Sequence, residues 1–169
     1  MKAIFAVDSS GGIGNKGSLP WPKHAEDLVW FKEHTLNNIV VMGKNTWKDK
    51  KMPKPLKDRI NVVVTNNPPE DALARYSTPD NLTETLITLK ESFPEKEIFV
   101  IGGKQVLEWL RPEIKTIYLT RFKGRYYTDT RLDLNSFLTG FRLMSVKPGD
   151  NCTFEVWEKI TFPWKDKEE

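Results

Sequence analysis

The sequence predicts an α/β fold with a mostly parallel central sheet, helices on both faces and a C-terminal antiparallel hairpin. Short apolar runs alternate along the chain with amphipathic helical patterns, and the runs at 60–64 and 98–101 are apolar throughout except for Asn61. Strands of that kind are buried on both faces of a parallel sheet. After residue 140 the pattern changes, because two alternating runs flank the turn sequence at 148–151 and predict a hairpin.

The elements are expected in a regular order. The first part should hold a strand at 3–7, a glycine-rich loop closed by Pro20 and Pro22, a helix from Asp27 to about Asn37, a strand at 39–42 and a short helix from Lys44. Next come strands at 60–64, 98–101 and 117–120, helices carrying Leu82, Leu86, Leu89 and Phe93 and then Val106, Leu107 and Leu110, and the hairpin of 141–146 and 152–160. Such a sheet binds ligands at the carboxyl ends of its strands.

Size and charge narrow the possible functions. The 169 residues, 38% of them hydrophobic, fit a single domain at 1–162 followed by a charged tail at 163–169 that we expect to be disordered. A net charge of +3, from 26 basic and 23 acidic residues, is too mild to indicate nucleic acid and suits a small anionic ligand. Nothing in the chain demands a protein partner, so a monomer is expected.

The sequence favours no metal site and no membrane segment. Cys152 is the only cysteine and lies in a strand-like run, where we expect a small hydrophobic side chain, and His24 and His34 are too few to build a metal site. No apolar run approaches the roughly 20 residues of a membrane span, and no signal peptide precedes the first strand. The expected compartment is the cytoplasm.

Asp27 is the most informative polar residue. It opens a predicted helix just after the turn at 17–21, and at helical spacing Trp30 and Phe31 fall on its side. A carboxylate against aromatic surface is desolvated unless a charged or protic group binds it, so this placement is typical of an acid kept for chemistry. The alternative is an acid in the first turn of a helix, where the dipole favours negative charge.

Glycines and hydrogen-bonding side chains gather where three predicted strands end. The junctions are Gly43 with Lys44 and Thr46, Thr65 with Asn66, and Gly102-Gly103 with the following helix. Paired glycines let the backbone approach a phosphate, and a helix start offers free N–H groups. A glycine after a strand is often only a turn, but three such junctions at one sheet edge favour phosphate binding.

The glycine-rich segment at 12–17 matches the spacing of the dinucleotide fingerprint and follows a strand. That fingerprint has to open a helix, whereas Leu19-Pro20-Trp21-Pro22 forces an extended chain here. We therefore reject the Rossmann interpretation and expect a mobile loop that closes over whatever Asp27 holds.

Together these residues resemble one family, the dihydrofolate reductases. The resemblance covers nearly the whole chain, in order: Ala6, Ile13-Gly14, Leu19-Pro20-Trp21, Asp27-Leu28, Trp30-Phe31-Lys32, Met42-Gly43-Lys44, Thr46-Trp47, Arg59, Ile101-Gly102-Gly103, Tyr118-Leu119-Thr120 and Asp129-Thr130. It implies a dihydrofolate reductase-like fold and an oxidoreductase that reduces 7,8-dihydrofolate to 5,6,7,8-tetrahydrofolate by hydride transfer from NADPH. Antifolate inhibitors are further expected ligands.

For the substrate, the resemblance implies Asp27, Trp21 and Thr120 as catalytic residues. Asp27 would orient the pterin and support protonation of its N5, Thr120 would extend that network, and Trp21 would order water beside Asp27. The implied substrate-binding residues are Ile4, Phe5, Ala6, Leu28, Phe31, Leu56, Arg59 and Ile101, with Arg59 clamping the glutamate carboxylate. Without the resemblance, Trp21 also fits a core aromatic and Arg59 a solvated surface charge.

For NADPH, the resemblance implies a second set of residues. They are Ala6, Ile13, Gly14, Leu19, Gly43, Lys44, Asn45, Thr46, Thr65, Asn66, Gly102, Gly103, Lys104, Gln105 and Val106. Asp129 should lie on a late loop that hydrogen-bonds the glycine-rich segment, although an exposed Asp in a polar loop is the commoner case. Three features depart from the family pattern. Lys44 stands where many members carry an arginine, and Leu107 stands where many carry an aromatic residue. The basic segment 48–57 is longer than usual.

Two other functions remain open on sequence grounds. A related reductase of a ribosylated pyrimidine would share the sheet and the Gly102-Gly103 junction, but would not require Trp21, Asp27 and Thr120 together. A nucleotide-binding module without chemistry would leave Asp27 as an ordinary residue at a helix start.

Overall fold

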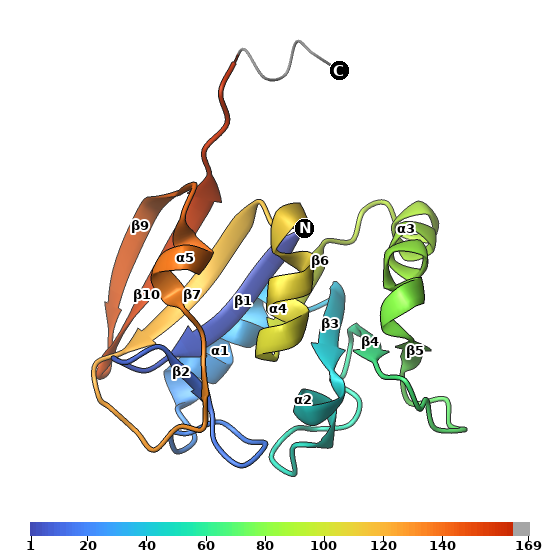
Figure 1. The fold of residues 1–169 in the computed structure, drawn as a ribbon, viewed down its shortest axis with the longest axis horizontal. Coiled ribbons are helices and arrows are strands. Elements are labelled where there is room, and N and C mark those ends of the chain that lie inside the picture. Colours follow the sequence, from blue (N-terminus) through green and yellow to red (C-terminus); the bar gives the residue numbers. More distant parts are fainter. Residues whose placement is uncertain (164–169) are drawn as a thin grey trace.

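The computed structural model describes residues 1–163 and contains one eight-stranded sheet (Figure 1). Its strand order is β5 (Arg75–Ser77), β4 (Ile60–Val64), β3 (Ile39–Gly43), β6 (Ile98–Gly102), β1 (Lys2–Val7), β7 (Thr116–Phe122), β10 (Cys152–Lys159) and β9 (Phe141–Gly149). The pairs from β5 through β7 are all parallel, and β10 pairs antiparallel with β7 and β9. The predicted parallel sheet with a C-terminal hairpin is confirmed.

Helices cover both faces of this sheet. They are α1 (Ala25–Thr35), α2 (Lys44–Lys48), α3 (Leu82–Ser92), α4 (Lys104–Leu110) and α5 (Leu134–Leu138). Side chains alternate along each strand, so Ile39 and Val41 join the core under α3, α4 and α5, while Val40 and Met42 join Trp30 of α1 on the other face. Accordingly, α4 and α1 lie on opposite sides of the sheet in Figure 1.

The structure corrects several boundaries. The helix that carries Asp27 begins at Ala25 and ends at Thr35, so Asp27 is its third residue rather than its first. The sequence analysis missed four short elements: β5, α5, and the strands β2 (Gly12–Gly14) and β8 (Thr130–Arg131), which pair antiparallel and join the predicted glycine-rich loop to a later segment. Elements of two to five residues are too short to leave a periodic signal.

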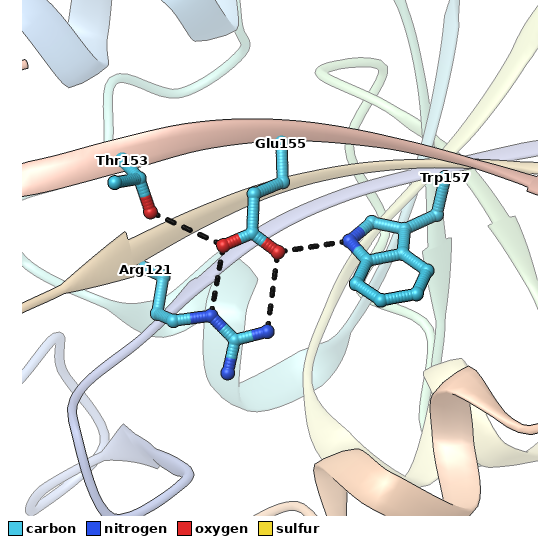
Figure 2. A network of polar contacts seen from close by, with 4 residues as sticks. All are labelled: Arg121, Thr153, Glu155 and Trp157. Carbon is cyan, nitrogen blue, oxygen red and sulfur yellow. Dashed lines mark hydrogen bonds and ion pairs between the residues drawn. The ribbon is translucent and has the colours of Figure 1, made fainter. Parts of the chain in front are cut away.

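A partly buried ion-pair network joins the hairpin to β7 (Figure 2). Arg121 Nε lies 2.9 Å from Glu155 Oε2 and Nη2 lies 3.1 Å from Oε1, while Thr153 and Trp157 also donate to this carboxylate. Burial alone would raise the pKa of Glu155, but these hydrogen bonds outweigh it and the pKa is lowered. The network fixes β10 against the strand that carries Thr120.

The structure bears on two further predictions, which concern membrane segments and the C-terminal tail. Among residues 1–163, none of the helices combines the length and apolar character that a bilayer crossing requires. The charged tail predicted for 163–169 lies, apart from Pro163, outside the described residues.

Candidate functional site

A groove of about 1160 Å³ crosses the carboxyl ends of the parallel strands. Its walls include the last residues of three strands, Gly43, Val64 and Gly102, together with segments from α1, α2 and α4. This is the edge at which the sequence analysis placed the ligand site. Every predicted site residue lines the groove except Trp21.

Asp27 and Thr120 meet inside the groove. Thr120 Oγ1 donates a hydrogen bond of 2.6 Å to Asp27 Oδ1, across 93 residues of sequence and from the sheet to a covering helix. Burial raises the pKa of Asp27, while the Thr120 hydrogen bond and the nearby His24 act against this increase. The carboxylate is therefore poorly solvated and favours a ligand that offers hydrogen-bond donors.

The start of α1 holds Asp27 in place. His24 is the N-cap residue, and its Nδ1 accepts a hydrogen bond of 3.1 Å from the backbone N–H of Asp27. His24 Nε2 lies 2.8 Å from the carbonyl oxygen of Asp150 in the hairpin turn. Histidine is not among the favoured N-cap residues, which explains why the sequence analysis placed the helix start two residues late.

Arg59 lies at the outer end of the groove and is held by three contacts. Its Nη1 donates to Thr35 Oγ1 at 3.1 Å, its Nε donates to the Lys57 carbonyl at 2.9 Å, and its guanidinium carbon lies 5.9 Å from the Phe31 ring centroid. Burial lowers the pKa of Arg59 and Asp58 opposes the change, but a guanidinium stays protonated in proteins. The structure thus brings a fixed cation to the same groove as Asp27.

The other half of the groove is built from glycine junctions. Gly43 and Gly103 are the N-cap residues of α2 and α4, and the peptide bond between Gly102 and Gly103 is cis. A Cβ atom on Gly43 would lie 3.2 Å from Val106 Cγ2, and Gly102 has a φ of 129°, in the region that favours glycine. These junctions leave backbone close to the groove, as a phosphate-binding site requires.

The glycine-rich segment is tied down at both ends of its turn. Lys16 N donates to Asp129 Oδ2 at 2.8 Å, which confirms the predicted contact between Asp129 and this loop. Ser18 Oγ lies 3.1 Å from both carboxylate oxygens of Asp49, just beyond α2. Gly17, Ser18 and Asp49 all line the groove, so the second contact joins two segments of its lining.

Trp21 lies outside the groove lining. It is 4% exposed, and its ring centroid lies 4.7 Å from that of Phe122 and 6.1 Å from that of Tyr126. These contacts make it part of an aromatic cluster beneath the Asp27 region. Its role in ordering water beside Asp27 stays a prediction.

The sequence analysis missed several lining residues. They include Ser18, Asp49, Pro79, Asp80, Glu108 and Trp109. Pro79 and Asp80 follow β5, which is only three residues long and therefore gave no signal for another strand end. The basic segment 48–57 was singled out, and Lys51, Met52 and Pro53 from it line the groove.

A groove with a half-buried acid and apolar walls in one half and glycine junctions in the other defines an α/β enzyme that brings two ligands together. A family model described as dihydrofolate reductase matches residues 1–155. The chain therefore belongs to the dihydrofolate reductase family.

Individual relatives agree with this assignment. The chain is 35% identical to dihydrofolate reductase type 9 from Escherichia coli, over 93% of this chain and 92% of that protein. It is 31% identical to the viral dihydrofolate reductase of Saimiriine herpesvirus 2 (strain 488), over 98% and 88%. A dihydrofolate reductase structure from Enterococcus faecalis, complexed with NADP(H) and RAB-propyl, matches with a TM-score of 0.78 and 26% identity, over 94% and 95%.

Proposed function

We propose that this protein reduces 7,8-dihydrofolate to 5,6,7,8-tetrahydrofolate with a hydride from NADPH. The observation that carries the proposal is the hydrogen bond between Thr120 and the half-buried Asp27, within the groove that also holds the glycine junctions. The family assignment supports the reaction, and the solved relative with NADP(H) supports the cofactor.

Asp27 binds the pterin edge. The 2-amino group and the neighbouring ring nitrogen of a dihydropterin present two parallel donors, which match the two oxygens of a carboxylate. Burial makes Asp27 a stronger acceptor in its ionised form, because water competes poorly for it. Thr120 holds one of these oxygens and so fixes the plane of the carboxylate.

The anion also promotes the proton transfer that reduction requires. Hydride adds to the carbon next to N5, and N5 takes a proton. A negative Asp27 stabilises the protonated pterin, whereas a neutral side chain there would not. Ile4, Leu28 and Phe31 line this half with apolar surface that limits water near the reacting atoms.

The second half of the groove fits NADPH. A side chain on Gly43 would crowd Val106, and the positive φ of Gly102 disfavours any residue with a side chain, so the backbone stays bare here, as a pyrophosphate site needs. Lys44, Thr46, Thr65 and Asn66 lie along this half and would bind the adenosine phosphates. When bound, the cofactor supplies the hydride, and Ala6 in the middle of the groove separates the two halves.

The groove also accounts for the glutamate part of the substrate and for inhibitors. Arg59 binds the glutamate carboxylate of the substrate through its planar guanidinium. Inhibitors that present paired donors to Asp27 would compete with the pterin. The protein acts as a cytoplasmic monomer in this proposal, which sedimentation of the purified chain would test.

The test is a spectrophotometric assay of NADPH oxidation with dihydrofolate as the substrate. We expect turnover with dihydrofolate and none with a ribosylated aminopyrimidine. Turnover only with the pyrimidine would indicate the related reductase. NADPH binding without turnover of either substrate would indicate a nucleotide-binding module without chemistry.

A further inference from the structure

Three potential metal ligands meet away from the groove lining, where the start of α1 approaches the hairpin turn. His24, Glu26 and Cys152 each offer one ligand atom, and these atoms all lie within 4.8 Å of one another. Cys152 is more than a hundred residues from the other two. The expectation of no metal site rested on the single cysteine and the small number of histidines, and such a count cannot reveal a mixed cluster that forms only in the fold.

Backbone groups of the hairpin turn contact two members of this cluster. Asp150 N donates to Glu26 Oε1 at 2.8 Å, and His24 Nε2 contacts the carbonyl oxygen of the same residue. A Cβ atom on Gly149 would overlap Glu26 Oε1 and lie 2.8 Å from Cys152 Sγ. A glycine therefore allows the carboxylate and the thiol to approach each other closely.

The cluster has an excess of negative charge. The pKa of the Cys152 thiol is raised to about 11, mainly by burial and also by the carboxylates of Glu26, Asp27 and Asp150, with Lys123 opposing them. The ion pair found within residues 1–163, between Arg121 and Glu155, involves none of these groups. A cation here would therefore relieve repulsion among several groups at once.

Thiolate, imidazole and carboxylate together are the ligands that Zn²⁺ prefers. With bonds of about 2.0 to 2.3 Å, tetrahedral ligand atoms lie roughly 3.3 to 3.8 Å apart. The three ligand atoms, which lie within 4.8 Å of one another, would have to move closer together to reach that geometry. Glu26 is exposed, so one of the three ligands is open to solvent, whereas Cys152 is buried.

We propose that His24, Glu26 and Cys152 form a site for a divalent cation of the zinc type, with water in the fourth position. Binding releases the thiol proton to solvent as the metal–sulfur bond forms, so affinity increases with pH.

Occupancy of this site competes with the helix cap. His24 Nδ1 accepts from Asp27 N, and Nε2 faces a carbonyl oxygen that can only accept, so Nε2 carries the proton. A neutral imidazole has one free lone pair, which the cap already uses. Metal binding therefore breaks the cap of the helix that positions Asp27, and a bound cation should reduce reductase turnover.

The binding test uses Co²⁺ as a probe, because a cobalt–thiolate bond produces a near-ultraviolet charge-transfer absorption. The wild-type protein should show this band at one equivalent of cobalt. Affinity should fall about 100-fold or more in Cys152→Ala and about 10-fold or more in Glu26→Gln, and stay unchanged in Glu33→Gln, an exposed acid on the same helix. Absence of the band in the wild type at millimolar cobalt, or equal affinities in all variants, would overturn the proposal.

The variant His24→Asn distinguishes the loss of a metal ligand from the loss of the helix cap. Asparagine is a favoured N-cap residue, so this variant keeps α1 capped while losing the imidazole ligand. If Cys152→Ala fails to fold, His24→Asn still tests whether the cluster binds the metal. Zn²⁺ should inhibit turnover in the wild type and have at least tenfold less effect on His24→Asn; equal inhibition would overturn the coupling. The cobalt band does not depend on activity, so failure of the reductase proposal would remain distinguishable.

Discussion

Three segments of the chain together position Asp27: the start of its own helix, β7 and the hairpin turn. His24 caps its helix, Thr120 fixes its carboxylate, and Asp150 holds the His24 ring from the hairpin turn. The acid is therefore oriented before any ligand binds. Preorganisation of this kind is what allows a single carboxylate to favour the transition state rather than only the substrate.

Replacing Asp27 with Asn tests its role directly. The amide keeps the shape of the carboxylate but removes the charge that stabilises the protonated pterin, so dihydrofolate turnover should fall by roughly two to four orders of magnitude at neutral pH. Part of the loss should be recovered at low pH, where the substrate is already protonated. Turnover measured across the pH range checks this, and a wild-type rate for the Asp27→Asn variant at neutral pH would contradict it.

Lys44 offers a test of cofactor choice. It is exposed at the start of α2, and its ammonium is a point charge suited to a phosphate. Lys44→Met should weaken NADPH binding about tenfold or more, because a charge-assisted hydrogen bond contributes about 1.5 to 3 kcal/mol, and should leave NADH binding nearly unchanged. Fluorescence titration with both cofactors measures this, and equal losses would exclude contact with the 2′-phosphate.

Among the elements, the C-terminal hairpin depends on the Glu155 network in Figure 2. Thr153 and Trp157 donate to different oxygens of Glu155, so Glu155→Gln keeps an acceptor for only one of them and removes the ion pair with Arg121. Because the Arg121 side chain is 40% exposed, the expected loss in the free energy of unfolding is about 1 to 2 kcal/mol rather than that of a fully buried pair. Urea unfolding at neutral pH measures it.

The same network predicts a pH dependence of stability. The folded pKa of Glu155 lies below its ordinary value of 4.5, so the stabilisation is fully present above pH 4.5 and is lost as pH falls through the folded value. The difference between wild type and Glu155→Gln should therefore narrow in acid. A constant difference from neutral to acidic pH would contradict this account.

The glycine-rich loop is held over the groove by Ser18 and Asp49. Ser18→Ala removes the hydroxyl that reaches both oxygens of Asp49, so the loop should open more readily and product release should become several-fold faster. Stopped-flow measurements of release and of hydride transfer separate the two steps. Unchanged release in the Ser18→Ala variant would show that this contact does not limit opening.

Long elements were predictable because their periodicity is a local property. The strands at 39–43 and 60–64 follow apolar runs that any parallel sheet requires. The edge of the sheet that carries the groove was predicted from the positions at which the strands end. Gly43 and Gly102 were therefore placed correctly from the sequence alone. The pairing of β2 with β8, the cap at His24 and the Ser18 contact depend on segments that meet only in the fold, so no local pattern could reveal them.

The charge of the whole molecule is unevenly distributed. Within 48–59, six basic side chains stand against two acidic ones, so this one segment exceeds the net charge of +3 of the entire chain. Several of its residues line the outer groove near Arg59. A dianionic glutamate tail should therefore be attracted to this end of the groove from a distance, an effect that salt screens.

Two exposed lysines of this segment that do not line the groove, Lys50 and Lys57, test the effect of long-range charge. Changing both to Gln should raise the KM for dihydrofolate about two- to tenfold at low salt and leave kcat unchanged, because only the encounter is affected. The difference from wild type should disappear at high salt. Arg142→Gln with Lys147→Gln removes the same charge from exposed positions on β9, at the far edge of the sheet, and should change KM little. An equal salt dependence in both double variants would mean that net charge, rather than the position of this basic segment, governs substrate capture.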